Sequence, residues 1–172
     1  MGNHGELLIQ GNWQMDDRFR KAVEKVLSVE GGHSNDPKDS GGETKFGISK
    51  KSYPTLDIKN LTREEAVDLY WRDFWLMYHY DKILDEKIAE KVFSFCVNMG
   101  PMRAHVLLQI ALNFTGKHVS VDGHLGPKTL EAINGHSNPA WLLATYQIQA
   151  AKFYLKLNSS RYEKGWIARA LA

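Results

Sequence analysis

The chain has 172 residues, 43% hydrophobic and 24% charged, which is typical of a globular protein with one sizeable core or two small ones packed together. Its formal net charge is +2 without a dense run of Lys and Arg, which disfavours sequence-specific nucleic-acid binding but allows an anionic polymer as partner. The single cysteine, Cys96, excludes an intramolecular disulfide, and no stretch is long and apolar enough to span a membrane.

The first expected helix carries an acid where its pattern requires a hydrophobic residue. Residues 1–15 are expected to form a loosely ordered leader without a secretory signal. Helical spacing then predicts a helix over 17–30, and Glu30 continues its apolar stripe. Burial and the negative end of the helix dipole both disfavour a charged carboxylate, so we expect a raised pKa and a proton available for general acid catalysis. Alternatively, a glutamate at a helix end turns out to solvent.

The segment after this helix combines turn residues with carboxylates. GGHSNDPKDSGGETKFGIS predicts a loop, a turn at Gly41-Gly42 and short strands that form a small hairpin close to Glu30. Glycoside hydrolysis needs a second carboxylate or a positioned water opposite the proton donor, which Asp39 and Thr44 are candidates to supply. Asp36 and Glu43 belong to the same cluster, although each of these acids can equally serve as a turn former.

The next two helices are marked by strong start and stop signals. Thr62-Arg63-Glu64-Glu65 is a capping box, and the helix that follows has an aromatic stripe with Trp71 and Trp75 four residues apart. This stripe favours a place in the core, although an edge of the two indoles is available in principle for stacking on sugar. A further helix is expected over 85–99, with the polar Asn98 near its end.

The remaining elements are also helical. Helices are expected over 102–114, from Pro127 to Ile133, and from Asn138-Pro139 to Leu157. The loop VDGHLGPKT before the short helix is explained by turn chemistry alone or by contact with a ligand. The sequence therefore predicts a mainly α protein with a small β-hairpin after the first helix and an internal boundary at Gly100-Pro101.

Two motifs resemble known families. EGGHSNDPKDSGGETKFGIS, from Glu30 onward, resembles the signature of glycoside hydrolase family 108, N-acetylmuramidases of phages and bacteria with a glutamate in an EGGY motif. VDGHLGPKTLEAI and KGWIARA are similar to the peptidoglycan-binding-like region that accompanies it. The resemblance implies a lysozyme-like helical fold, with a muramidase region over 16–100 and a peptidoglycan-binding-like region over 101–172 packed as one compact body. It also implies cleavage between N-acetylmuramic acid and N-acetylglucosamine, with Glu30 as the general acid.

The predicted site combines this resemblance with the residue chemistry. The catalytic candidates are Glu30, Asp39 and Thr44, and the substrate-binding candidates are His33, Asp36, Glu43, Phe46, Trp71, Trp75 and Asn98. His33 stands where the family usually has Tyr, so an aromatic ring is kept and a phenol is lost, and binding can become pH-dependent. The order Glu-Asp-Thr is similar to that of phage-type lysozymes, which is an analogy at the level of the fold.

Alternatives to a muramidase remain at this stage. A lytic transglycosylase uses one acid and no attacking water, and a non-catalytic peptidoglycan-binding or secretion-regulating module keeps the fold alone. The seven histidines are scattered without an HExxH-like pair, so we expect neither a metal nor another cofactor. The expected partner is the peptidoglycan glycan strand, bound by a monomer without nucleic acid or membrane insertion. Without an export signal, we expect the protein in the cytoplasm until release or export to the wall, as for a prophage endolysin.

Overall fold

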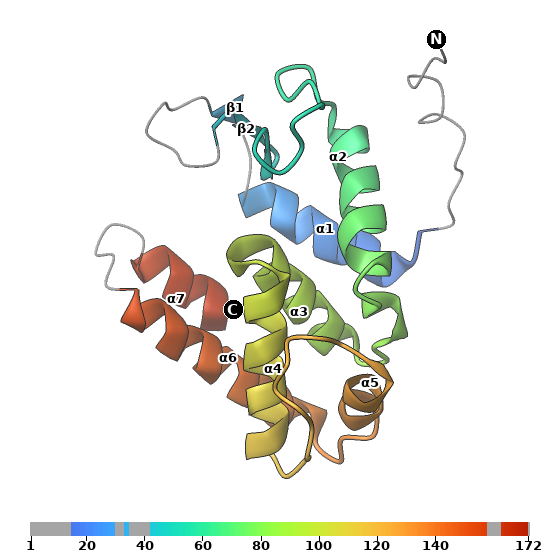
Figure 1. Cartoon of the computed structure of the whole chain (residues 1–172), viewed down its shortest axis with the longest axis vertical. Helices are drawn as coiled ribbons and strands as arrows, with labels where there is room; N and C mark the ends of the chain where they lie inside the picture. The colour runs from blue at the N-terminus through green and yellow to red at the C-terminus, as the bar shows by residue number, and fades with distance from the viewer. Residues whose placement is uncertain (1–14, 30–32, 35–41, 158–162, 172) are drawn as a thin grey trace.

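The computed structural model describes residues 15–29, 33–34, 42–157 and 163–171. It confirms the prediction of a mainly α protein with a small antiparallel sheet after the first helix (Figure 1). In chain order, the elements are α1 (Asp17–Val29), β1 (His33–Ser34), β2 (Thr44–Lys45), β3 (Ile48–Ser49), α2 (Arg63–Tyr70), the π-helix η1 (Trp71–Leu76), the 3₁₀ helix η2 (Tyr80–Lys82), α3 (Glu86–Met99), α4 (Pro101–Phe114), α5 (Pro127–Asn134), α6 (Pro139–Lys156) and α7 (Glu163–Leu171). The helices predicted from periodicity are confirmed to within one or two residues.

Helix α1 is amphipathic as its sequence pattern predicts. Its core-facing stripe is at most 6% exposed and consists of Phe19, Ala22, Val23, Val26 and Leu27. The opposite face carries ion pairs to α3, with Lys21 contacting Glu86 at 2.9 Å and Lys25 contacting Glu90 at 2.7 Å. These pairs are largely exposed and each contributes at most about 1 kcal/mol, so hydrophobic burial holds α1 in place.

The sheet has three short antiparallel strands in the order β1-β2-β3. Thr44 in the central strand pairs with Ser34 in β1 and with Ser49 in β3. The tight turn lies at Phe46 and Gly47, whose φ values of 53° and 78° are those of a type I′ hairpin. The turn predicted at Gly41-Gly42 includes Gly41, which lies outside the described residues, so it stays a prediction.

The aromatic helix differs from its prediction in geometry. The capping box is present, with the Glu65 amide donating to Thr62 Oγ1 and the Thr62 amide donating to the Glu65 carboxylate. After Tyr70, however, the α-helix continues as η1. Trp75 is fully buried and Trp71 is 8% exposed, and both rings pack against Phe19 with centroid distances of 5.5 and 4.9 Å. The indoles therefore belong to the core, as most aromatic stripes do.

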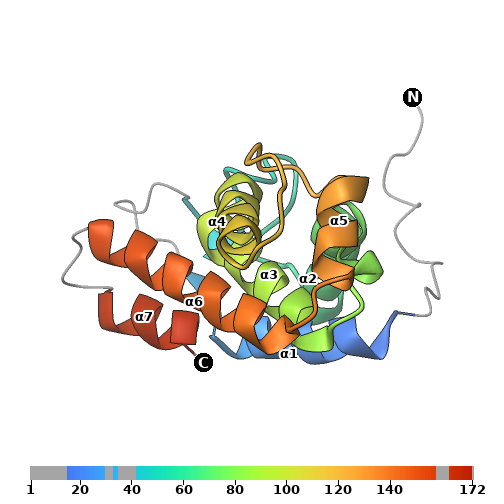
Figure 2. The ribbon, with the colours of Figure 1, turned by 90° about the horizontal axis from the view of Figure 1, so that it is seen from below.

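The C-terminal helices form a layer around α4. Gly100, with φ of 84°, lets the chain reverse between α3 and α4, and Pro101 begins α4. Helix α6 packs against α4, with the Tyr146 hydroxyl donating to the Ala104 carbonyl at 3.0 Å. Figure 2 shows α7 alongside α6, and α5 on the other side of α4. Among the described residues, no helix combines the length and apolar character that a membrane span requires.

Candidate functional site

The predicted acid follows directly on the buried stripe of α1. Helix α1 ends at Val29, and β1 begins at His33, so Glu30 occupies the connection between the helix and the sheet in the sequence. Figure 1 shows the sheet beside this end of α1. Glu30, Asp36 and Asp39 lie outside the described residues, and their predicted roles remain predictions.

Thr44 is fixed in the middle strand of the sheet. It is half-buried, and its hydroxyl donates to the Gly42 carbonyl at 3.1 Å. Because β2 pairs with β1, Thr44 lies opposite Ser34, one residue after His33. The backbone of His33 pairs with Lys45 in the same ladder, whereas its side chain lies outside the description. The register thus brings Thr44 to the strand that follows Glu30, as the predicted hairpin requires.

Two other predicted residues lie at the sheet. Glu43 is half-buried, and its carbonyl accepts from the Lys50 amide at 2.8 Å. Phe46 is half-buried in the type I′ turn, with Lys45 Nζ 5.5 Å from its ring centroid. The Tyr70 hydroxyl donates to the Phe46 carbonyl at 3.0 Å. This bond fixes the turn to α2, so Phe46 is held in one place relative to the helical body.

Three further predicted ligand-binding residues lie in helices and not in the sheet. Trp71 and Trp75 are corrected to core residues, since Trp75 has no exposed surface for a sugar to contact and Trp71 almost none. Asn98 is half-buried near the end of α3, and its Oδ1 accepts from the Tyr154 hydroxyl. Asn98 therefore joins α3 to α6 through its side-chain oxygen.

Sequence reasoning missed the aromatic side chains that do reach the surface. Phe74 and Tyr78 are half-buried and their ring centroids lie 6.4 Å apart. The Phe74 ring lies 5.3 Å from that of Tyr70, which in turn reaches Phe46. An aromatic row, defined as Phe46, Tyr70, Phe74 and Tyr78, thus runs from the sheet along α2 and η1. The four-residue spacing of Tyr70, Phe74 and Tyr78 is visible in the sequence, but Trp71 and Trp75 have the same spacing and were predicted to bind sugar in their place.

A polar cluster borders this row. The Tyr53 hydroxyl donates to Asp73 Oδ2 at 2.9 Å, and Arg72 donates to both oxygens of the same carboxylate, at 2.6 Å from Nε and 2.9 Å from its second donor. The hydrogen bond from Arg72 lowers the pKa of Asp73 below its ordinary 3.8, although partial burial opposes this. Asp73 is therefore ionised at neutral pH and is unsuited to donating a proton.

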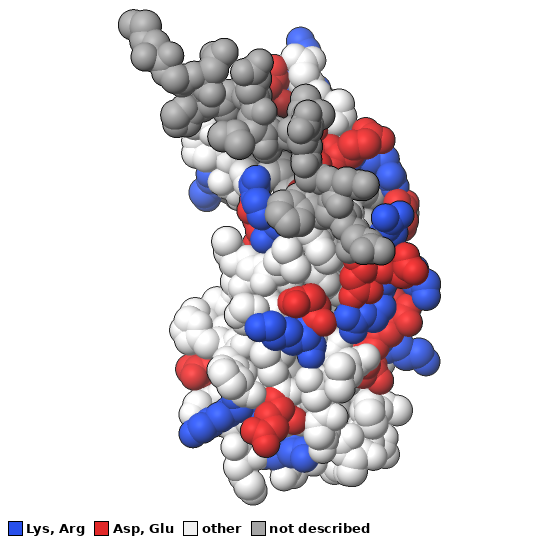
Figure 3. Space-filling view, turned by 90° about the vertical axis from the view of Figure 1, so that its right-hand side faces the viewer, with Lys and Arg blue, Asp and Glu red and all other residues white. Residues whose placement is uncertain are grey.

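Charged and potential metal-binding side chains are spread across the described residues. Figure 3 shows basic and acidic side chains interspersed on the face that it presents, without a basic patch among the coloured residues. Across the described parts of the chain, no three His, Cys, Asp or Glu side chains come together as a metal site.

Comparisons with known proteins agree with this arrangement. Residues 23–100 match the family model described as glycosyl hydrolase 108. This N-terminal part of the chain is similar to the glycosyl hydrolase 108 family. Residues 103–171 match a second model, described as a predicted peptidoglycan domain. The glycosyl hydrolase 108 match covers α1 from Val23 onward, the sheet, α2, η1, η2 and α3, so it contains the whole set of predicted site residues.

A solved structure extends the comparison to the fold. The structure titled "Structure of Brucella abortus SagA" is 28% identical in sequence, with 90% of each chain covered and a TM-score of 0.76. No curated protein gives a significant match to the chain. The lysozyme-like helical fold expected from the sequence is confirmed. The two family matches support a peptidoglycan-acting protein with a domain of the glycoside hydrolase type.

Proposed function

We propose that the protein is an N-acetylmuramidase that cleaves the bond between N-acetylmuramic acid and N-acetylglucosamine, with Glu30 as general acid. The observation that carries this proposal is the burial of the α1 stripe, every member of which faces the core up to Leu27. Glu30 is the next position of that stripe in the sequence. An acid that follows a buried helix face, at the negative end of the helix dipole, retains its proton more readily than a solvated one.

The proposed reaction uses Glu30 and a water molecule. Glu30 protonates the glycosidic oxygen as the bond to the leaving sugar breaks, and the water attacks the anomeric carbon. The attacking water releases its second proton to solvent, from which Glu30 is reprotonated. The Thr44 hydroxyl donates its proton to Gly42, so its lone pairs are suited to accept a hydrogen bond from this water. Asp39 either orients the same water or stabilises positive charge on the sugar ring.

Three members of the aromatic row, Phe46, Phe74 and Tyr78, supply a surface for the glycan strand, whereas Tyr70 is fully buried. Phe74 and Tyr78 are half-buried, and they extend from Phe46 along one side of η1. Flat apolar faces with limited exposure suit the apolar faces of sugar rings, and rings fixed by packing lose little entropy on binding. We place the glycan along this row, in the position that the sequence pattern assigned to Trp71 and Trp75.

We also propose that the two parts of the chain have different roles, cleavage and binding of peptidoglycan. A hydrolase region over 16–100 and a peptidoglycan-binding-like region over 101–172 agree with the two family matches, which change over between residues 100 and 103. The wall is the site of action, and we propose that a monomer reaches it after release or export from the cytoplasm.

Product analysis tests the proposed reaction. Purified peptidoglycan is incubated with the wild-type protein, and the soluble fragments are identified by mass spectrometry. A muramidase releases fragments that end in reducing N-acetylmuramic acid. Anhydro-sugar ends instead identify a lytic transglycosylase, and pelleting of the protein with the wall without soluble fragments identifies a binding module. Either result overturns the proposal.

A further inference from the structure

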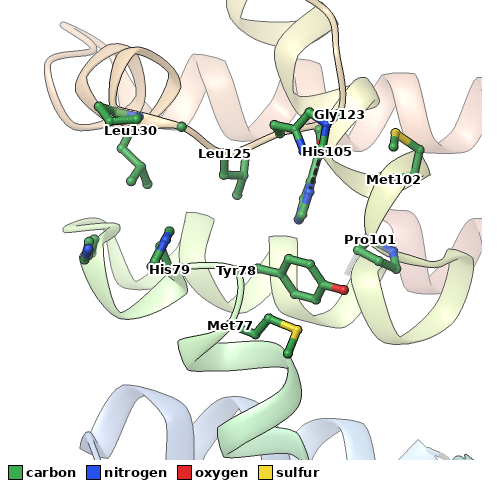
Figure 4. Close-up of a pocket in the computed structure, with 13 residues that line it drawn as sticks. Met77, Tyr78, His79, Pro101, Met102, His105, Gly123, Leu125 and Leu130 are labelled. Carbon is green, nitrogen blue, oxygen red and sulfur yellow. Dashed lines mark hydrogen bonds between the residues drawn. The ribbon is translucent and has the colours of Figure 1, made fainter.

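A cavity of about 570 Å³ lies between the two family regions, apart from the sheet. One wall comes from the segment Met77–Lys82, another from the start of α4, and the third from the loop VDGHLGPKT with the start of α5. Figure 4 shows Leu125 and Leu130 facing Tyr78 and His79 across this space. Its volume is in the range of cavities that bind small molecules and short peptides.

Two buried polar side chains of α4 hold the loop in place. Gln109 Oε1 accepts from the amides of Asp122 at 3.0 Å and Gly123 at 2.8 Å, and its Nε2 donates to the His124 carbonyl at 2.9 Å. His105 Nδ1 lies 2.9 Å from the Gly123 carbonyl, so this nitrogen donates. Because two buried side chains bond the loop, the third wall is fixed before a ligand arrives.

His105 also joins the loop to the hydrolase region. Its Nε2 lies 2.7 Å from the Tyr80 hydroxyl, which donates to it in the tautomer that Gly123 requires. Both partners and the imidazole are buried. The neutral ring therefore fixes the spacing between η2 and the loop, which are opposite walls of the cavity.

The rim of the cavity is suited to anions. Lys82, His79 and His124 contribute to the lining, whereas none of the described lining residues is Asp or Glu. Helices α4 and α5 both begin at the cavity, and neither has a side-chain cap for its first amides. Uncapped helix N-termini carry a partial positive charge, which adds to that of Lys82.

The walls below this rim are apolar and adaptable. Met77 and Met102 line the cavity and are 58% and 55% exposed, so both side chains are accessible to a ligand. Their unbranched thioether side chains repack around ligands of differing shape. The cavity thus combines an apolar interior with a cationic rim, which is complementary to a short peptide that has small apolar side chains and free carboxylates.

We propose that this cavity binds the stem peptide of peptidoglycan, with its carboxylates at Lys82 and His124 and its alanine methyl groups against Met77 and Met102. The proposal rests on peptidoglycan as the substrate and deepens the proposed function. Tyr78 belongs both to the cavity lining and to the aromatic row, so a glycan along the row carries its attached peptide toward the cavity. The protein then recognises the sugar chain and the peptide at adjoining sites.

Binding of a free stem peptide tests this inference without any cleavage. The pentapeptide L-Ala-γ-D-Glu-L-Lys-D-Ala-D-Ala is added to the ¹⁵N-labelled full chain, and amide shifts are followed by NMR. We expect saturable shifts at Gly123 and Leu125, and about tenfold weaker binding for Lys82→Gln combined with His124→Gln, since hydrogen bonds to charged groups are the strong ones. Lys87→Gln, an exposed lysine of α3 outside the cavity, is the matched control and should bind as wild type.

Three results overturn the inference. The first is the absence of shifts at Gly123 and Leu125 at millimolar peptide. The second is equal affinity for the same peptide with its carboxylates converted to carboxamides, because the cationic rim then selects nothing. The third is displacement of the peptide by N-acetylglucosamine oligomers, which assigns the cavity to the glycan. Since Glu30→Gln should bind the peptide as wild type, failure of the muramidase proposal and failure of this inference are separate outcomes.

Discussion

Replacing Gln109 by Met removes the side chain that holds the loop VDGHLGPKT while keeping a similar volume. Gln109 is fully buried and makes four hydrogen bonds of 2.8–3.0 Å, one of them to the Asp122 carboxylate. Its loss leaves the buried Gly123 amide without this acceptor, which costs about 1–3 kcal/mol. The Asp122 amide and carboxylate and the His124 carbonyl lie nearer the surface and can form hydrogen bonds with water in place of Gln109. We therefore expect the free energy of unfolding to fall by about 2–4 kcal/mol in total.

For a chain of this size, that loss lowers Tm by roughly 4–16 °C. Calorimetry measures the shift, and urea unfolding should give the same change in the free energy of unfolding. A second readout follows from Asp122, whose pKa is lowered mainly by the hydrogen bond from Gln109. In Gln109→Met the pKa of Asp122 should rise toward its ordinary 3.8, as followed by NMR titration.

The matched control is Gln147→Met in α6. Gln147 donates a single hydrogen bond of 3.3 Å, to the Leu171 carbonyl at the exposed end of α7, so its loss should cost less than about 1 kcal/mol. If Gln109→Met melts at the temperature of the control, the loop does not depend on Gln109 and the reasoning about a preformed wall is wrong.

Four further outcomes are expected. Burial lowers the pKa of His105 below its ordinary 6.5. The stability that the neutral imidazole provides is therefore complete above pH 6.5 and is lost as pH falls through the lower folded-state pKa. Urea titrations between pH 8 and 4 should show a smaller acid-induced loss of stability for His105→Gln than for wild type, and equal losses would contradict this. Burial raises the pKa of Cys96 to about 12, so a thiol reagent at pH 8 should label the native protein only as fast as it unfolds, whereas rapid labelling in buffer would place the thiol at the surface. Tyr78→Ala should raise KM for glycan cleavage with little change in kcat; an unchanged KM would remove the aromatic row from the substrate site. Thr44→Val, which keeps the shape of the side chain, should lower kcat by about 10²-fold if its hydroxyl orients the attacking water, and wild-type kcat would show that it does not.

The helices were predictable because their signals are local. The stripe of α1, the capping box at Thr62 and the sequence Gly100-Pro101 each specify a boundary or a buried face within a few residues. The aromatic helix was predicted only in part. The change from α-helix to π-helix at η1 has no recognisable signal in the sequence. Trp71 and Trp75 face the core, as the aromatic stripe favours, whereas Phe74 and Tyr78 are half-buried and were not among the predicted site residues.

Non-local contacts limited the prediction of the site and the cavity. The loop VDGHLGPKT was ambiguous from the sequence, because turn chemistry explained every residue in it. The conformation of this loop depends on Gln109 and His105, which bond to Gly123. Both residues lie far from Gly123 in the sequence and contact it only in the folded chain. Likewise, the place of Thr44 beside the strand that follows Glu30 depends on the register of the sheet. Short-range patterns do not specify such pairings.

The rate of peptidoglycan cleavage by Glu30→Gln tests the central proposal most directly. The substitution keeps the shape of the side chain and removes its transferable proton, so the release of reducing sugar ends should fall by about 10²–10⁴-fold. Glu24→Gln, the same change on the exposed face of α1, removes an ion pair with Arg63 and should leave the rate within about twofold of wild type. If Glu30→Gln cleaves the wall at the wild-type rate, Glu30 is not the general acid.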